Sequence, residues 1–162
     1  RQGEHGNALL SRWPLGDIGH HDVSDHRFEQ RGLLHVPVNW NGVMVHAIVV
    51  HLGLIHASRV RQVERIAALI AAEVPPNERL ILAGDFNDWG ERLDGPLRDI
   101  GLARAIAPNA RVLRTFPSLI PVFSLDRVYT RGLRCTSAFV PRGSNWARMS
   151  DHLPYVAELE LD

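Results

Sequence analysis

Apolar positions along the chain follow two periods, one typical of strands and one typical of helices. Two runs rich in aliphatic and β-branched residues, 33–38 and 43–52, flank Asn41-Gly42. Because Asn-Gly is a favoured centre of a type I′ turn, the pattern predicts an antiparallel hairpin. In the second run both alternating sets of side chains are largely apolar, which predicts a central strand covered on both faces.

A helical period follows the hairpin. Between Ala57 and Glu73, apolar residues recur at three- and four-residue spacing and polar residues fill the other face, so the pattern predicts an amphipathic helix that ends at Pro75-Pro76. The remaining predictions are strands at 6–12, 80–83, 125–129, 137–140 and 155–161, a short helix at 95–100, and loops at 17–30 and 115–121. Without internal repeats or composition breaks, residues 1–162 are expected to form one layered α/β domain with largely antiparallel sheets.

Composition narrows the class of protein. With 162 residues, 45% of them hydrophobic and 22% charged, the chain is globular and large enough to bury roughly 70% of its unfolded surface. Its formal net charge is zero, so an anionic substrate must be held by local groups rather than by a global positive field. The single cysteine excludes an internal disulfide and fits the reducing cytoplasm. No apolar stretch approaches the roughly 18 residues of a membrane-spanning helix.

The first candidate for chemistry lies where the apolar run 80–83 meets Gly84-Asp85-Phe86-Asn87-Asp88. Ligand sites of α/β sheets lie at such strand ends. In an extended segment Asp85 and Asn87 point the same way and offer a carboxylate and an amide to a phosphate, a cation or a water. The alternative is an Asx turn that merely ends the strand.

Further candidates occupy other strand ends. His51 closes the run 43–52, where it can face a cleft, although a hydrogen-bonded structural histidine is the alternative. Asp126 lies in a β run and needs a partner if it is buried; the adjacent Arg127 faces the other way. His152 is the expected partner, because an Asp–His dyad fixes the imidazole tautomer and raises its basicity. Asp151 points elsewhere and can bind metal.

A second Ser-Asp-His copy serves as an internal comparison. Ser24-Asp25-His26 lies in the predicted loop with His20, His21 and Asp22, and no apolar strand follows it. We expect solvated surface there. The alternative is a zinc site formed by the imidazoles and carboxylates of this loop.

Taken in chain order, these strand-end motifs resemble the endonuclease/exonuclease/phosphatase superfamily, the metal-dependent phosphohydrolases related to deoxyribonuclease I, exonuclease III, neutral sphingomyelinases and inositol polyphosphate 5-phosphatases. Residues 4–12 resemble the strand that precedes the hairpin of that family, and Arg59 with Gln62 resembles its R-x-x-Q helix. Thr115-Phe116-Pro117-Ser118 is similar to small bacterial members with no settled substrate. The resemblance implies a deoxyribonuclease I-like α/β sandwich.

The resemblance also implies a reaction, the hydrolysis of a phosphate ester by activated water with Mg²⁺ or Mn²⁺ as cofactor. Asp85 and Asp151 would be the metal ligands. Nucleic acid, a phospholipid headgroup and an inositol phosphate all present the same phosphoryl centre, so the substrate stays open.

Roles carry over only to matching residues. Asp126 would orient His152, which would act on the attacking water or on the transition-state oxygens. Asp85 is the competing candidate for activating the water. Asn87 would position the scissile phosphate, and His51 would contact it or assist the leaving oxygen.

One departure from the family pattern bears on activity. Members normally begin with a strand that carries a metal-associated asparagine, followed by a Gln-Glu segment whose glutamate is the chief magnesium ligand, and neither segment is in this sequence. The chain is therefore expected to be the C-terminal two-thirds of a domain, incomplete at its N-terminus, to bind magnesium weakly and to self-associate through an exposed sheet edge. The alternative function is a catalytically silent binding or scaffold module of the same fold.

Overall fold

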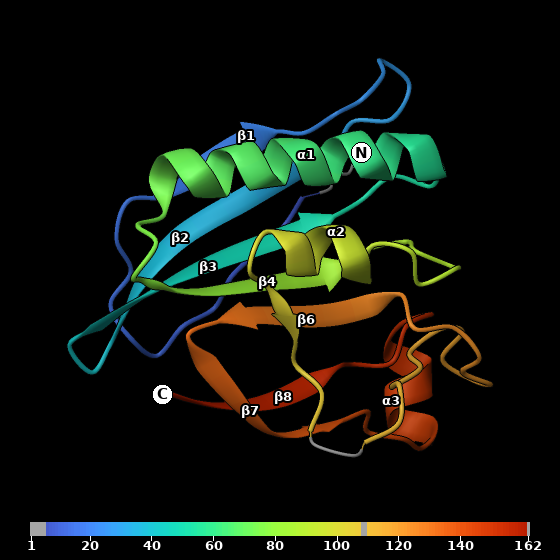
Figure 1. The fold of residues 1–162 in the computed structure, drawn as a ribbon. Helices are drawn as coiled ribbons and strands as arrows, with labels where there is room; N and C mark the ends of the chain where they lie inside the picture. Colours follow the sequence, from blue (N-terminus) through green and yellow to red (C-terminus); the bar gives the residue numbers. More distant parts are fainter. Residues whose placement is uncertain (1–5, 108–109, 162) are drawn as a thin grey trace, which may run out of the picture.

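The computed structural model describes residues 6–107 and 110–161, and its centre is a six-stranded sheet with two helices on one face (Figure 1). Glu4 and His5, which the family resemblance included, lie outside the described residues. In chain order the elements are β1 (Gly19–Asp22), β2 (Gly32–Trp40), β3 (Val43–His51), α1 (His56–Glu73), β4 (Arg79–Asp85), α2 (Asp94–Asp99), β5 (Ala103–Arg104), β6 (Asp126–Arg131), β7 (Leu133–Phe139), α3 (Ser144–Met149) and β8 (Val156–Leu161).

The predicted hairpin is confirmed. β2 and β3 pair antiparallel from Leu33 opposite Val50 to Trp40 opposite Val43. Asn41 and Gly42 both have positive φ, 53° and 88°, as a type I′ turn requires. The middle of β3 is buried on both alternating sets of side chains, which confirms a central strand.

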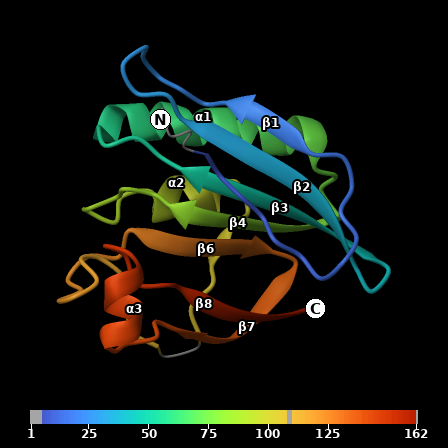
Figure 2. The same cartoon turned by 180° about the vertical axis from the view of Figure 1, so that it is seen from behind.

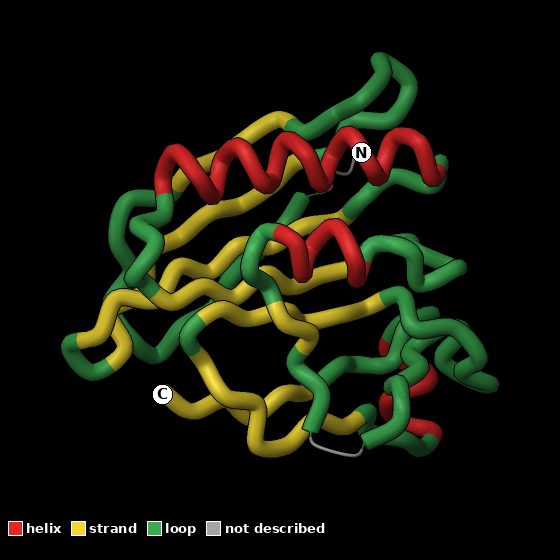
Figure 3. Tube along the Cα trace, in the orientation of Figure 1, coloured by secondary structure: helices red, strands yellow, loops and turns green. Residues whose placement is uncertain are grey.

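The core lies between the sheet and α1. Val63, Ile66 and Ile70 of the helix pack in one cluster with apolar strand residues such as Ile48 and Leu80. In Figure 3 the two upper red helices, α1 and α2, cover one side of the yellow strands. The helix ends as predicted, since Val74 donates its N–H to the Ile70 carbonyl and a proline follows.

Strand direction brings the candidate residues to one edge of the sheet. In the order β1-β2-β3-β4-β6-β5, β3 and β4 run parallel and β6 runs antiparallel to β4. The last residues of β3 and β4 therefore lie beside the first residue of β6. Gly84 permits this close pairing, because a Cβ there would lie 1.8 Å from the Val50 carbonyl oxygen.

Two sequence predictions are wrong at the start of the chain. Residues 6–12 form no strand; Asn7 instead donates side-chain hydrogen bonds to the carbonyls of Gly32 and Val49, and Leu10 is almost fully exposed. The predicted loop 17–30 contains β1, a short edge strand that pairs with β2. Its alternate residues are exposed, so pairing rather than apolar burial defines it.

The remaining elements agree with the layered α/β prediction and its largely antiparallel pairing. β7 and β8 form a separate two-stranded sheet next to β6 (Figure 2). β7 begins four residues earlier than predicted, because the register shifts between Cys135 and Ser137 and disguises the alternation. Among the described residues, no helix has the length and apolar character needed to cross a membrane.

Candidate active site

Four of the predicted residues form a row across the strand ends. His51 is the register partner of Asp85, and Asp85 is the register partner of Asp126. Nε2 of His51 lies 3.5 Å from Oδ2 of Asp85. His152 joins the far end, with its Nδ1 2.7 Å from Oδ2 of Asp126. The predicted contact between Asp126 and His152 is confirmed.

The segment 115–118 holds the dyad in place. Leu153 donates its N–H to the Thr115 carbonyl at 2.8 Å, and Ser118 donates to the Asp151 carbonyl at 2.7 Å, so the residues on both sides of His152 are fixed. The ring of Phe116 lies against the imidazole, with 4.8 Å between their centroids. The Thr-Phe-Pro-Ser motif thus positions the histidine, a role that the sequence alone did not suggest.

The electrostatics of the row differ from residue to residue. The hydrogen bond to Asp126 raises the pKa of His152 above its ordinary value, so this imidazole stays protonated at higher pH than usual. Burial, together with the positive charge of Arg31, lowers the pKa of His51. Burial raises the pKa of Asp85, and the neighbouring charge of Asp126 adds to the increase. Asp85 is therefore a more basic carboxylate than a solvated one.

Asn87 does not continue the extended strand. Its φ is 47°, and its backbone N–H donates to Oδ1 of Asp85 at 2.8 Å, so the Asx turn is present. The side-chain amide donates to the Leu52 carbonyl at 2.8 Å. The expectation that Asp85 and Asn87 project alike from an extended segment is wrong, because β4 ends at Asp85. A phosphate contact by Asn87 stays a prediction.

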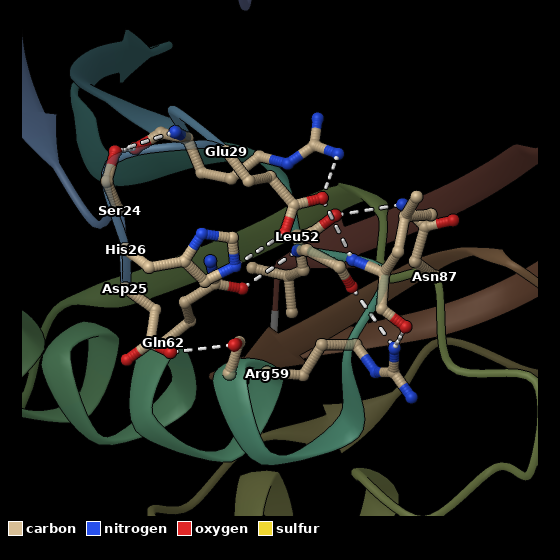
Figure 4. A network of polar contacts seen from close by, with 12 residues as sticks. Ser24, Asp25, His26, Glu29, Leu52, Arg59, Gln62 and Asn87 are labelled. Atoms are coloured by element: carbon tan, nitrogen blue, oxygen red, sulfur yellow. Dashed lines mark hydrogen bonds and ion pairs between the residues drawn. The ribbon is translucent and has the colours of Figure 1, made fainter.

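The loop that follows His51 is fixed by a polar network (Figure 4). Arg59 donates to the carbonyls of Gly53 and Leu54, at 3.1 and 2.6 Å. Gln62 accepts the Gly53 N–H at 2.8 Å, and Glu29 accepts the Leu54 N–H at 3.1 Å. The R-x-x-Q pair therefore anchors the loop rather than facing a substrate.

Ser24-Asp25-His26, the internal comparison, was predicted to be solvated surface, and this prediction is wrong. Asp25 accepts hydrogen bonds from Ser58 at 2.7 Å and from both Nε and Nη2 of Arg61 at 2.6 Å. These bonds hold the pKa of Asp25 far below its ordinary value. The motif fastens the β1–β2 loop to the first turns of α1, a distant pairing that local sequence does not indicate.

On the other side of β6, Arg127 forms a buried ion pair with Asp88. Nη1 of Arg127 lies 2.9 Å from Oδ2 of Asp88, and Nη2 donates to the Asp88 carbonyl at 2.8 Å. Arg127 thus faces away from Asp126, as predicted. Sequence reasoning missed the partnership with Asp88, although a charged residue inside a β run was the signal that could have found it.

The predicted metal ligands, Asp85 and Asp151, form no contact with each other like the one within the Asp126–His152 dyad among the interactions described. Asp151 is exposed and accepts a hydrogen bond from the Ser150 hydroxyl at 3.3 Å. In residues 6–107 and 110–161, no three histidine, cysteine or carboxylate ligands converge at these strand ends. A metal role for Asp85 and Asp151 stays a prediction.

The row opens into two hollows. A broad depression of about 1300 Å³ is lined by His51 and by the β1–β2 loop. A cavity of about 470 Å³ lies at the other end, beside Asp126 and His152, and its wall includes the exposed side chains of Trp146 and Met149. The dyad is therefore accessible and has an apolar surface next to it.

Comparison with known proteins gives matches over nearly the whole chain. A model of the Endonuclease/Exonuclease/phosphatase family matches residues 1–152. The uncharacterized protein YbhP of Escherichia coli K12 is 36% identical over 164 residues, which is 99% of this chain and 64% of YbhP. The chain thus spans a little under two thirds of this relative.

Solved structures share the fold at low sequence identity. An endonuclease/exonuclease/phosphatase from Bacteroides vulgatus superposes with a TM-score of 0.77 at 19% identity, over 93% of this chain and 67% of that one. A mannosyl-6-phosphatase from Bacteroides thetaiotaomicron gives a TM-score of 0.71 at 16% identity, over 92% of this chain and 67% of the other.

Proposed function

The chain belongs to the endonuclease/exonuclease/phosphatase family, and we propose that it hydrolyses a phosphate ester at the row formed by His51, Asp85, Asp126 and His152. The observation that carries the proposal is the 2.7 Å contact between His152 and Asp126, beside the half-buried carboxylate of Asp85. A carboxylate can only accept, so Nδ1 of His152 carries the proton and Nε2 is left for chemistry. This is the orientation that an acid–base histidine needs.

Each side chain then has a stated task. The raised pKa of His152 extends the pH range over which the imidazole is cationic and can donate to the phosphoryl oxygens as negative charge develops. Asp85, whose pKa is raised by burial, is a suitable acceptor for the proton of the attacking water. His51, beside Asp85, reaches the leaving oxygen from the opposite hollow.

The residues at the strand ends provide only part of a binding site for a divalent cation. When bound, it would polarise a phosphoryl oxygen as a Lewis acid. Asp85 and Asp151 are oxygen donors of the kind that Mg²⁺ prefers, but among the described residues neither belongs to a group of three converging ligands. We therefore expect the metal to bind weakly.

The surroundings of the dyad support a proposal for the substrate class. The 470 Å³ cavity with Trp146 and Met149 in its wall favours an ester that carries an apolar or aromatic group next to its phosphate. The name of the mannosyl-6-phosphatase shows that one protein of this fold acts on a phosphomonoester. Both monoesters and diesters are therefore within the proposal.

The test is hydrolysis of p-nitrophenyl phosphate and bis(p-nitrophenyl) phosphate by the purified chain, with Mg²⁺, Mn²⁺ or EDTA. His152→Ala should lower turnover by about 10²- to 10⁴-fold. His20→Ala, an exposed histidine on β1, should keep wild-type turnover. Matching circular dichroism spectra for both variants would show that folding is intact. Near-normal turnover of His152→Ala would overturn the dyad assignment.

The catalytically silent module is the second candidate, favoured because no three potential metal ligands converge at the strand ends among the described residues. It predicts that the wild type binds inorganic phosphate or an aryl phosphate but releases no p-nitrophenol with either metal. That result would replace the enzyme proposal by a binding function of the same site.

A further inference from the structure

A cluster of histidines and glutamates lies away from the strand-end row, on the opposite half of the sheet. His21 comes from edge strand β1, His35 from β2, and Glu73 is the last residue of α1. Figure 1 shows β1 and β2 beside α1. Potential ligand atoms of these three side chains lie within 4.8 Å of one another, and no other such trio occurs in the described part of the chain.

The cluster continues inward as a chain of hydrogen bonds. Oε2 of Glu73 lies 3.0 Å from Nδ1 of His35, and Nε2 of His35 lies 2.8 Å from Nδ1 of His46. Nε2 of His46 then lies 2.5 Å from Oε2 of Glu78. Both imidazoles are almost fully buried, so water does not substitute for a missing partner.

Two neutral imidazoles supply one proton too few for the three contacts of this hydrogen-bond chain. Each neutral imidazole of His35 and His46 carries one N–H, and the ionised carboxylates carry none. Three contacts therefore share two protons. If His46 donates to Glu78 and His35 donates to His46, the lone pair of Nδ1 on His35 faces the Glu73 carboxylate with nothing between them.

A second observation points to the same place. Nε2 of His21 is buried and has no hydrogen-bond partner, and it lies 3.5 Å from Oε2 of Glu73. Two imidazole nitrogens and one carboxylate oxygen thus converge on one point. An unpaired lone pair costs free energy in such a site unless a cation accepts it.

We propose that His21, His35 and Glu73 form a binding site for a divalent transition-metal ion of the Zn²⁺ class, separate from the phosphohydrolase row. Two imidazoles and a carboxylate are donors that Zn²⁺ prefers over Mg²⁺. Zinc bonds of about 2.0–2.1 Å in a tetrahedron place ligand atoms about 3.3 Å apart. The two distances from Glu73 to the imidazole nitrogens, 3.0 and 3.5 Å, are close to this value, and all three ligand atoms lie within 4.8 Å of one another.

The surroundings complete the site. His46 and Glu78 continue the chain behind His35 and fix its tautomer, as outer partners of zinc-bound histidines do. Glu73 is 41% exposed and His21 is 28% exposed, which leaves a route for the ion and space for a water as fourth ligand. A cation there also offsets the unfavourable charge of Glu73 at the C-terminus of α1.

The bound ion would link three secondary-structure elements. It would fasten the four-residue edge strand β1 to β2 and to the end of α1. Its function is thus to stabilise the fold, and no hydrolytic step depends on it.

The test is binding of Zn²⁺ and Co²⁺ to the metal-free chain. Titration calorimetry should give one Zn²⁺ site, and Co²⁺ should show the visible absorption of four or five nitrogen and oxygen ligands. Saturation at about a hundredfold excess over the dissociation constant should raise the melting temperature by about 5–10 °C. His21→Ala and Glu73→Gln should each weaken binding at least about tenfold.

Matched controls separate this site from other histidines and carboxylates. His20→Ala on β1 and Glu64→Gln on α1, both exposed, should bind as the wild type does. Asp85→Asn should also keep the zinc site. Wild-type affinity in His21→Ala and Glu73→Gln, loss of binding only in Asp85→Asn, or no binding below millimolar Zn²⁺ would each overturn the proposal.

Discussion

Two neighbouring residues at the start of β6 hold two aspartate ion pairs of opposite kind. Asp126 meets His152 on the open side of the strand, where each side chain is 23% exposed. Arg127 meets Asp88 on the covered side, where both side chains are fully buried. Because adjacent strand residues face opposite ways, one strand end carries a reactive pair and a closed pair.

The two pairs differ in whether their remaining hydrogen-bonding groups are accessible to a ligand. Arg127 also donates to the Ser124 carbonyl at 3.0 Å and lies 3.3 Å from Asp94, so its donors are directed inward. His152 spends Nδ1 on Asp126 and keeps Nε2 for a ligand. A fully buried pair with inward-directed donors fixes the strand end, whereas an accessible pair with a free imidazole nitrogen is available for chemistry.

The largest effect should come from breaking the closed pair. Arg127→Ala leaves the Asp88 carboxylate buried without its cation, which should lower the free energy of unfolding by about 3–5 kcal/mol. Urea denaturation followed by circular dichroism measures this loss. Activity should fall with the folded fraction rather than through a separate catalytic defect.

Two controls test whether burial is the reason. Arg134→Ala removes an exposed partner of Glu160 and should change stability by no more than about 1 kcal/mol. Replacing both charges, Asp88→Asn with Arg127→Met, should recover much of the stability lost in Arg127→Ala, because no unpaired ion remains. A small loss in Arg127→Ala would contradict the assignment of this pair as structural.

The open pair should respond in activity instead. Asp126→Asn removes the charge that stabilises the imidazolium, so turnover should fall by about 10²-fold while stability changes by less than about 1 kcal/mol. Kinetics on bis(p-nitrophenyl) phosphate and urea denaturation measure the two quantities.

The same variant should also change how stability depends on pH. The pKa of His152 is raised in the folded chain, so its contribution to stability is present below its ordinary value of 6.5 and is lost as pH rises through the folded value. Removing Asp126 should lower the His152 pKa in an NMR titration and remove that part of the stability curve. An unchanged His152 titration would separate the two residues functionally despite their contact.

Most of the fold could be predicted from local pattern. The hairpin at Asn41-Gly42 and α1 follow from turn chemistry and helical period, and they agree with the structure within two residues. β1 and α3 were not predicted, because β1 alternates without apolar residues and α3 buries none of its side chains. Elements defined by pairing or by a neighbouring loop leave little trace in hydrophobic periodicity.

Only the part of the site that lies at strand ends could be predicted from the sequence. The contact of Asp126 with His152 followed from the cost of an unpaired carboxylate in a β run. His35 and His46 also lie within apolar runs and need polar partners, yet their partners Glu73 and Glu78 lie 32 or more residues away. Which distant acid meets which histidine depends on packing of α1 over the sheet, which the local pattern does not specify.

The smallest expected effect is a change in melting temperature at Asp85, and its sign is opposite to the loss of stability expected on the covered side of β6. Burial raises the pKa of Asp85, so its ionised form at neutral pH lowers stability, whereas Asn would still accept the Asn87 N–H. Asp85→Asn should therefore raise the melting temperature by roughly 1–3 °C at pH 7 while it reduces turnover. The advantage should vanish as pH falls below 3.8, the ordinary value, where the wild-type carboxyl is protonated. Scanning calorimetry at pH 3.5 and pH 7 with EDTA present measures both. A melting temperature that falls at pH 7 would make Asp85 a stabilising residue like Asp88, and the division between a reactive and a structural side of this strand end would then fail.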